Sequence, residues 1–272
     1  MRTVKPIDAN LSATNYYRGK TMPKNKVALD GNFRTEIEKE VSRTLEKRFI
    51  ECPDSFEVKL ENFTKYAKRQ KLTRLLSLYE IFKRILPVKG SVIECGVYRG
   101  FGLMAWAQFS AILEPVNFAR RIYGFDTFGG FTEASKEDKT TLAEVKKGGL
   151  AASSFEELNS LIRLYDLNRF LGHINKVCLI KGNAVTTIPK FVKKNPHLVI
   201  SLLFLDFDLF EPTKVAIENF VPLMPKGAII AFDELDNPLW PGETQALIKT
   251  IGIPNLKIER LDFDPYIGFA VI

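Results

Sequence analysis

Hydrophobic residues along this 272-residue chain change their spacing near residue 90. Before that point they recur every three or four residues, which is the period of an amphipathic helix. After it they form short apolar runs that alternate with helical segments, as in a parallel sheet with crossover helices. We therefore expect an N-terminal arm and helical cap over residues 1–88 and an α/β domain over residues 89–272.

Two helices are predicted in the N-terminal segment. The first, residues 34–49, has a narrow apolar stripe at four-residue spacing, which consists of Ile37, Val41, Leu45 and Phe49. The second, residues 66–86, has a wider apolar face and ends before Pro87, because proline cannot continue a helix. Residues 1–32 show no sustained period and are expected to form an irregular arm.

Seven apolar runs predict the strands of a doubly wound, mostly parallel, Rossmann-like sheet that ends in an antiparallel pair. They cover residues 91–95, 122–125, 177–180, 198–205, 227–232, 257–261 and 267–272. An unusually long section, residues 126–176, separates the second run from the third and contains a helix near residues 155–170. Long connections of this kind are often functional lids, so we expect a lid insertion here.

Two neighbouring runs end in acidic residues. Asp206 and Asp208 follow the fourth run, and Asp233 and Glu234 follow the fifth. Because ligands of open α/β sheets bind outside the carboxyl ends of the strands, Asp206, Asp233 and Glu234 are expected to converge on a metal or polar ligand. Carboxylates suit Mg²⁺, Mn²⁺ or Ca²⁺. The alternative is structural, since an Asp after a strand often caps a helix or forms a turn, and Asp208 fits that role.

The net charge of +7 is concentrated in one part of the chain. Residues 1–90 contain 20 basic and 11 acidic residues, whereas residues 91–272 contain 19 and 21. Such an excess can serve an anionic substrate, but no nucleic-acid-binding motif accompanies it, so we expect no nucleic-acid partner. No apolar run approaches the roughly 20 residues that span a bilayer, and the N-terminus lacks the apolar core of a secretory signal. We expect a cytoplasmic protein without a membrane partner.

A glycine-rich loop follows the first run, at residues 94–102. Gly96 and Gly100 permit a tight turn and the close approach of a ligand to the backbone. The loop lacks the GxGxxG dinucleotide fingerprint and the Lys-Ser/Thr pair of a phosphate loop. Asp126, at the end of the second run, is placed to accept ribose hydroxyls, and Gly182 with Asn183 is placed to face a base.

These segments together resemble class I S-adenosylmethionine-dependent methyltransferases, and more narrowly the macrocin O-methyltransferase family. The matching pieces are residues 94–100, 123–131, 181–183, 205–213 and 233–234. The resemblance implies S-adenosylmethionine as cofactor, a divalent metal, usually Mg²⁺, and a sugar hydroxyl as acceptor. It implies that the cofactor is bound by Glu94, Gly96, Val97, Tyr98, Gly100, Asp126, Thr127, Gly182, Asn183 and Asp206, and the metal by Asp206, Asp233 and Glu234. The family commonly has two adjacent aspartates where this chain has Asp233 and Glu234.

A metal that binds the acceptor hydroxyl would lower its pKa, and Asp206 would then take the proton as the catalytic base. His173 and His197 are expected to be structural or exposed, and Trp240 either stacks on a sugar ring or anchors the core. The family resemblance also implies a homo-oligomer. Three alternatives stay open at this point: an NAD-dependent oxidoreductase, a non-catalytic module that binds an adenosine nucleotide or nucleic acid, and a hydrolase or hydroxylase-like relative that uses the same acidic strand ends for other chemistry.

Overall fold

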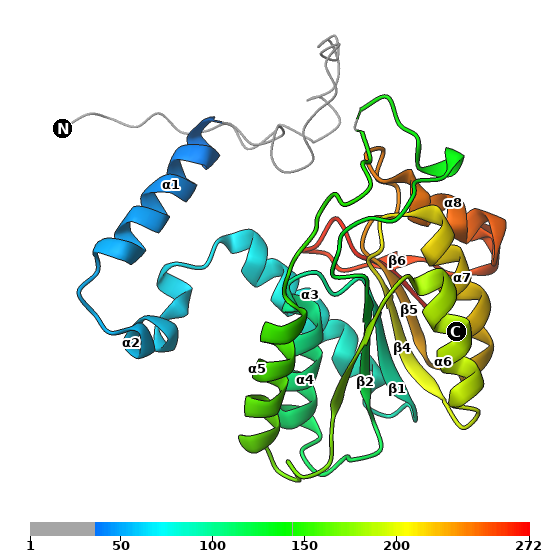
Figure 1. The fold of residues 1–272 in the computed structure, drawn as a ribbon, viewed down its shortest axis with the longest axis horizontal. Helices are drawn as coiled ribbons and strands as arrows, with labels where there is room; N and C mark the ends of the chain where they lie inside the picture. Colours follow the sequence, from blue (N-terminus) through cyan, green and yellow to red (C-terminus); the bar gives the residue numbers. More distant parts are fainter. Residues whose placement is uncertain (1–35, 143) are drawn as a thin grey trace.

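A computed structural model describes residues 36–142 and 144–272. The arm expected over residues 1–32 lies outside the described residues, as does the start of the first predicted helix at Arg34. Within the described residues, a single mixed sheet is covered by helices on both faces (Figure 1). The expected α/β class is therefore confirmed.

The sheet has the strand order β3-β2-β1-β4-β5-β7-β6. Strands β1 to β5 are parallel, and β7 runs antiparallel to both β5 and β6. The strands are β1 (Ser91–Cys95), β2 (Ile122–Asp126), β3 (Val177–Lys181), β4 (Ile200–Leu205), β5 (Ile229–Phe232), β6 (Glu259–Arg260) and β7 (Gly268–Val271). All seven predicted runs form strands, and their observed ends differ from the predicted ones by no more than two residues.

Helices on both faces explain why the central strands are continuous apolar runs. In β1 and β4 every residue is buried. Alternate residues of β4 enter different cores, because Leu202 and Phe204 pack on one face and Leu203 and Leu205 on the other. A strand buried on both faces has no solvent side to carry polar residues, so its sequence does not alternate.

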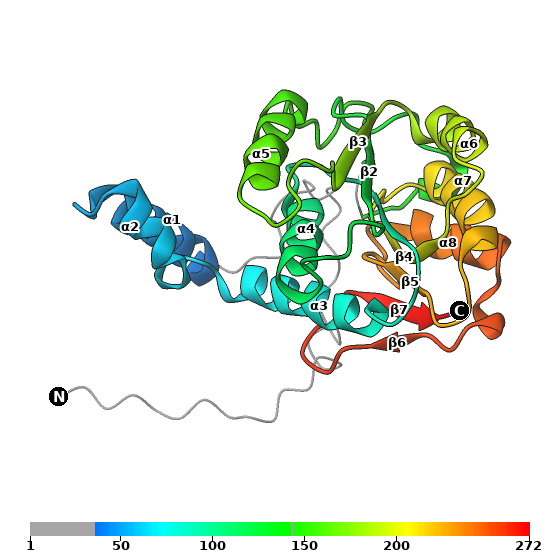
Figure 2. The same ribbon diagram turned by 90° about the horizontal axis from the view of Figure 1, so that it is seen from below.

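Helices cover both faces of the sheet (Figures 1 and 2). One face carries α3 (Arg69–Ile85), α4 (Phe101–Leu113) and α5 (Phe155–Leu167), and the other carries α6 (Ala184–Lys194), α7 (Phe210–Phe220) and α8 (Pro241–Lys249). Short 3-10 helices lie at η2 (Phe63–Lys65), η3 (Lys136–Asp138), η4 (Val221–Leu223) and η5 (Ile253–Asn255). This arrangement leaves the carboxyl ends of the parallel strands free to form a site.

The N-terminal helices divide into two groups. Helix α3 buries Leu78, Ile81 and Phe82 in the core beneath one face of the sheet. By contrast, α1 (Glu36–Glu51) and the short α2 (Phe56–Glu61), which was not predicted, contain no buried residue and extend away from the sheet (Figures 1 and 2). The boundary expected at residue 88 would assign α3 to the N-terminal cap. In the structure, α3 packs into the core of the α/β domain.

The expected insertion, residues 126–176, contains η3 and α5 and lies partly over the carboxyl edge of the sheet (Figure 1). It is tied to the chain after β5, since the Thr140 hydroxyl donates to the carbonyl of Pro238 at 2.9 Å and the ring of Phe131 contacts that of Trp240. None of the helices in residues 36–142 and 144–272 is long and apolar enough to cross a bilayer.

Candidate active site

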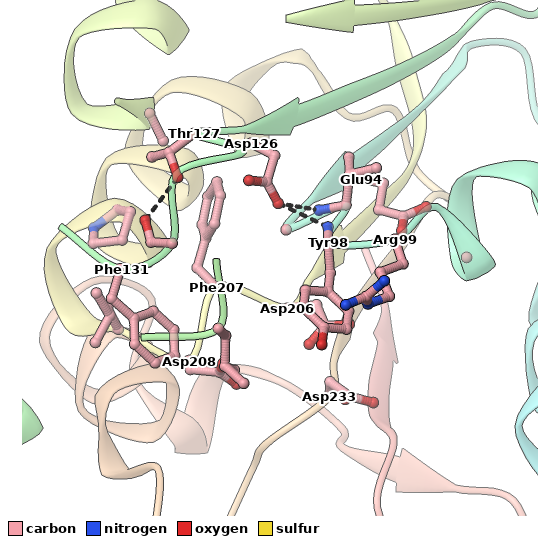
Figure 3. A pocket seen from close by; sticks show the side chains of 18 of the residues that line it. Glu94, Tyr98, Arg99, Asp126, Thr127, Phe131, Asp206, Phe207, Asp208 and Asp233 are labelled. Atoms are coloured by element: carbon pink, nitrogen blue, oxygen red, sulfur yellow. Dashed lines mark hydrogen bonds between the residues drawn. The ribbon is translucent and has the colours of Figure 1, made fainter. Parts of the chain in front are cut away.

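A cavity of about 310 Å³ lies at the carboxyl ends of the parallel strands. The segments that follow β1, β2, β3, β4 and β5 all contribute to it, and α3 and the insertion close its sides (Figure 3). The volume is in the range of small-molecule sites. The position is the one at which open α/β sheets bind their ligands.

The loop from β1 to α4 forms one wall of the cavity. At Gly96 the backbone has a φ of 99° and approaches the end of β4 so closely that a Cβ atom would lie 1.9 Å from the carbonyl oxygen of Asp206. Gly100, with a φ of 85°, forms the N-cap of α4. Both positions need glycine, for steric reasons at the first and for a left-handed conformation at both.

Asp126 holds this loop in place. Its Oδ2 atom accepts hydrogen bonds from the N–H groups of Val97 and Tyr98, each at 2.8 Å (Figure 3). Its Oδ1 atom accepts one from the N–H of Phe128 at 2.5 Å. The carboxylate predicted to bind ribose thus also joins the ends of β1 and β2. Each oxygen has two lone pairs, so capacity for a ligand hydroxyl remains.

The cavity wall beyond β2 and β3 is built from turns. The Thr127 hydroxyl donates to the carbonyl of Gly130 at 2.7 Å and shapes the start of the insertion. Gly182 continues the sheet by donating its N–H to the carbonyl of Asp126 at 2.9 Å. Asn183 caps α6, because its side-chain oxygen accepts the N–H of Val185 at 3.0 Å. The side chains of Thr127 and Asn183 therefore stabilise the turns that form this wall.

Glu94 brings a buried carboxyl group to the cavity. The residue is 2% exposed and lines the cavity beside Gly102 in the first turn of α4. Burial raises the pKa of Glu94 well above its ordinary value, and repulsion by Asp206 adds to the rise. The indole of Trp106 opposes this rise, yet Oε2 has no partner with hydrogen-bond geometry among the described residues. A buried acceptor of this kind favours a cationic ligand group.

An ion-pair cluster forms the opposite wall. Arg74 of α3 donates from Nη2 to Oδ2 of Asp206 at 2.8 Å and from Nη1 to Oδ1 of Asp233. The three side chains retain 23%, 25% and 13% exposure, respectively. The guanidinium also lies over the ring of Phe204. Of the three acidic residues expected to converge, Asp206 and Asp233 thus meet at a cation from the N-terminal segment.

The carboxylates of this cluster are strongly perturbed. Burial raises the pKa of Asp206 well above its usual range, and repulsion by Asp233 adds to the rise while Arg74 opposes it. Burial likewise raises the pKa of Glu234 to about 7, with a further contribution from Asp233. Burial alone would lower the pKa of Arg74, but attraction to Asp233 and Asp206 raises it overall. Perturbed groups gathered in a cavity are typical of an active site.

Glu243 of α8 forms hydrogen bonds to the backbone after both β4 and β5. Its side chain is fully buried, and it accepts the N–H of Asp208 at 3.2 Å and the N–H of Glu234 at 3.1 Å. Asp208 itself adopts a left-handed turn conformation with a φ of 63°, which agrees with the turn role predicted for it. One buried carboxylate thus fixes the backbone after both β4 and β5.

Most of the predicted site residues line the cavity. Nine of the ten predicted cofactor residues do so, namely Glu94, Gly96, Val97, Tyr98, Asp126, Thr127, Gly182, Asn183 and Asp206. The tenth, Gly100, caps α4 instead. Asp233 lines the cavity, but Glu234 does not, and its carboxylate accepts a hydrogen bond from Asn237.

Other side chains considered in the sequence lie outside the cavity. His173 and His197 are exposed, in agreement with the prediction for them. Trp240 is 8% exposed, packs on Phe131 and does not line the cavity, which favours an anchoring contact over sugar stacking.

Sequence reasoning missed Arg74 and Glu243. For Arg74 a signal existed, because it precedes Leu78 by one helical turn and so lies on the buried face of α3. A cation on an apolar helix face requires a partner. Glu243 offered no comparable signal, since its burial depends on how α8 packs.

Comparisons with known proteins agree with this geometry. The macrocin-O-methyltransferase family model matches residues 68–248. The structure of CalS11, a calicheamicin methyltransferase, is 32% identical and superposes with a TM-score of 0.83, over 88% of this chain and 93% of that one. The O-methyltransferase NovP shares the fold at 20% identity and a TM-score of 0.58, over 73% of this chain and 79% of its own.

A sequence relative is known from Streptomyces olivaceus. It is the 8-demethyl-8-(2,3-dimethoxy-alpha-L-rhamnosyl)-tetracenomycin-C 4'-O-methyltransferase, which is 26% identical over 168 residues. The match covers 60% of this chain and 60% of the length of that relative.

Proposed function

The chain belongs to the macrocin O-methyltransferase family of S-adenosylmethionine-dependent enzymes, and on this premise we propose that it methylates a sugar hydroxyl. The observation that carries the proposal is the cavity, in which a glycine-rich loop and a buried acid face a second acidic cluster. Glu94 suits the ammonium group of the cofactor, because its Oε2 is buried and unpaired among the described residues. Family membership also favours this activity over the oxidoreductase and the non-catalytic module.

The acceptor we propose is a deoxyhexose carried by a natural product or by a nucleotide. Another CalS11 structure is described as a TDP-rhamnose 3'-O-methyltransferase, and the Streptomyces olivaceus relative is named for a rhamnosyl substrate. In this chain, Lys71 and Arg99 bring positive charge to the cavity, and Phe101 and Phe131 bring aromatic surface. Cations beside aromatic rings suit a sugar that is linked to phosphate or to an aromatic ring system.

In the proposed reaction, an oxygen of the acceptor attacks the methyl carbon of the sulfonium group in line with the departing sulfur. The O–C bond forms as the S–C bond breaks, and S-adenosylhomocysteine leaves. The hydroxyl proton passes to Asp206, which lies at the cavity wall after β4. Its raised pKa makes it a stronger base than an ordinary aspartate, although only its ionised fraction can accept the proton.

The divalent metal implied by the family does not fit the cluster as it is arranged. In the part of the chain that the structure describes, no group of three or more His, Cys, Asp or Glu side chains is placed to hold a metal ion. Arg74 already bridges Asp206 and Asp233, and Glu234 bonds to Asn237. The three predicted ligands remain a prediction, and no step of the mechanism is assigned to a metal.

Association with further copies of the chain, and a cytoplasmic location, also remain proposals. The exposed apolar side chains of α1 and α2, which include Ile37, Val41 and Phe56, support association. Exposed apolar side chains grouped on a surface are typical of interaction sites.

The first test is calorimetric titration with S-adenosylhomocysteine, with NAD as the comparison. We expect micromolar binding of the former alone. Methyl transfer is then measured with TDP-rhamnose and with rhamnosylated aromatic acceptors. Binding of NAD alone, or of neither ligand, would overturn the proposed function.

Asp206→Ala tests the assigned base. We expect turnover to fall by about 100-fold or more, since general-base catalysis contributes factors of this order, while affinity for S-adenosylhomocysteine changes only a few-fold. Asp262→Ala, at an exposed position, is the control. Unchanged turnover in Asp206→Ala would remove Asp206 from the mechanism.

A further inference from the structure

We propose that Arg74 is the resident cation of the acidic cluster and occupies the position between Asp206 and Asp233 that a divalent metal would otherwise fill. The inference rests on the proposed function, because it assigns Arg74 a role beside the methyl acceptor. It concerns Arg74 of α3 and the two aspartates that directly follow β4 and β5, of which Asp233 lies 159 residues after Arg74 in the sequence.

The first argument is the geometry of the contacts. The two terminal nitrogens of Arg74 each donate to a different carboxylate, Nη2 to Asp206 and Nη1 to Asp233. A Mg²⁺ ion shared by the two aspartates would need one oxygen of each at about 2.1 Å from a common point. A guanidinium placed between the carboxylates takes up that point.

The second argument is that Arg74 is held by more than its ion pairs. Leu78 and Phe82, one and two turns further along α3, are fully buried in the core. Arg74 therefore projects from an anchored helix, and its guanidinium also rests over the ring of Phe204, 5.6 Å from the ring centre. A cation fixed on an aromatic face and on two carboxylates does not swing freely into solvent.

The third argument concerns charge. Glu94, Asp206 and Asp233 line the same cavity. Glu234 follows Asp233 in the sequence, and the Glu243 carboxylate accepts the N–H groups of Asp208 and Glu234. Arg74 is the cation that forms salt bridges with this cluster among the described residues. Burying several carboxylates without a cation is strongly unfavourable, so the fold needs a positive charge here. A side-chain cation supplies it at every metal concentration.

The arrangement has a catalytic consequence. A guanidinium has five N–H donors, and two of those of Arg74 are used in the hydrogen bonds to the aspartates. The residue lines the cavity, so other donors are available to the acceptor oxygen. Arg74 would then orient the hydroxyl group and favour its deprotonated form, while Asp206 takes the proton.

The test compares metal binding and turnover in the full-length protein and two variants. Mn²⁺ binding is followed by electron paramagnetic resonance, and methyl transfer is measured with and without EDTA. We expect the wild-type protein to bind no Mn²⁺ below millimolar concentration and to keep its turnover in EDTA within twofold. Arg74→Met removes the charge but keeps most of the volume, and it should gain Mn²⁺ binding and lose about 100-fold in turnover without added metal.

Arg84→Met is the matched control, because Arg84 lies on the same helix and its guanidinium rests over the ring of Phe269, away from the cluster. This variant should gain no Mn²⁺ binding. Arg74→Lys keeps the charge, so it should also gain no Mn²⁺ binding. This variant provides a second test of the proposal if Arg74→Met fails to fold.

Tight stoichiometric binding of Mn²⁺ by the wild-type protein, or loss of its activity in EDTA, would overturn the proposal. These outcomes are distinct from failure of the proposed function. In that case S-adenosylhomocysteine would not bind at all, whatever the metal content.

Discussion

At the scale of single residues, the Asp126 carboxylate has two roles: it stabilises the backbone of the site, and it is expected to bind the ribose of the cofactor. It accepts three backbone N–H groups from the loop after β1 and from its own turn. Removing it leaves these donors without their partner and loosens the wall that meets the cofactor.

Asp126→Ala should therefore weaken binding of S-adenosylhomocysteine by about 10- to 100-fold, equivalent to about 1.4–2.8 kcal/mol. Isothermal titration calorimetry measures this change directly. Asp262→Ala, at an exposed site, should bind like the wild type. Unchanged affinity in Asp126→Ala would show that the loop keeps its shape without this carboxylate and that the ribose does not contact it.

Lys176, which precedes β3, makes stability depend on pH. It is 4% exposed, and its ammonium group donates a hydrogen bond to the carbonyl of Asn117. Burial lowers the pKa of Lys176 to about 8, and Arg169 adds to the decrease while Glu114 opposes it. The unfolded chain keeps a value of about 10.4. Between these two values the unfolded state binds more protons than the folded state, so stability rises with pH in this window.

The difference in unfolding free energy between the wild type and Lys176→Met should shift in favour of the wild type between pH 8 and pH 10. The slope is at most about 1.4 kcal/mol per pH unit. Urea denaturation at pH 7.5 and pH 9.5 measures it. Lys194→Met, at an exposed position, is the control and should show no such change. A difference that is flat with pH in Lys176→Met would contradict the assignment.

At this scale the sequence was most informative where backbone geometry limits the choice of residue. Gly96 was predicted from its place after an apolar run, and the structure shows why a side chain is excluded there. Side-chain partners were harder to predict. The pairing of Arg74 with Asp206 and Asp233 depends on how α3 lies across the sheet, which no local pattern specifies.

At the scale of elements, α8 controls the geometry of the two acidic loops through Glu243. Its carboxylate accepts one backbone N–H from the segment after β4 and one from the segment after β5. In Glu243→Gln, one oxygen becomes an amide NH₂ group that faces a backbone donor, so one hydrogen bond is lost in a fully buried place.

Glu243→Gln should lower turnover by about 10-fold or more, since misplacing a reacting group by a small distance has effects of this order. Affinity for S-adenosylhomocysteine should change little, because the hydrogen bonds of Glu243 go to the backbone after β4 and β5 and not to the glycine-rich loop after β1. Steady-state kinetics and calorimetry separate the two effects. Glu218→Gln, on the exposed side of α7, is the control. Equal losses of turnover and cofactor affinity would instead indicate a general effect on folding.

The strands were the elements best predicted from the sequence. Apolar runs such as residues 200–205 are buried on both faces, and this burial is what makes the runs continuous. The short helix α2 was missed because six residues without a buried face leave no periodic signal. Predicted helix ends were less accurate for a related reason: the second helix begins at Arg69, three residues later than expected.

At the scale of the whole molecule, α1 and α2 lie apart from the sheet and the helices that cover it (Figure 2). Both expose apolar side chains. Ile37 is 76% exposed and Val41 is 51% exposed, although both belong to the apolar stripe of α1. A stripe of this kind gains stability when a second copy of the chain covers it.

The double substitution Ile37→Ser and Val41→Ser should therefore shift the protein towards the monomer. Sedimentation velocity at several protein concentrations measures the shift. Glu46→Ser, on the same helix, is exposed and outside the stripe, and it should leave association unchanged. A wild-type protein that is already monomeric at high concentration would contradict the proposed association.

The position of α3 has a consequence for recombining members of this family. Helix α3 covers the sheet and also delivers the guanidinium of Arg74 to the cluster after β4 and β5. A chimaera that takes its N-terminal segment from another relative and joins it at residue 88 would exchange this charge together with the segment. Specificity swaps intended to alter acceptor choice should therefore use a crossover point before residue 69, so that the helix and the carboxylates it neutralises are inherited as one unit.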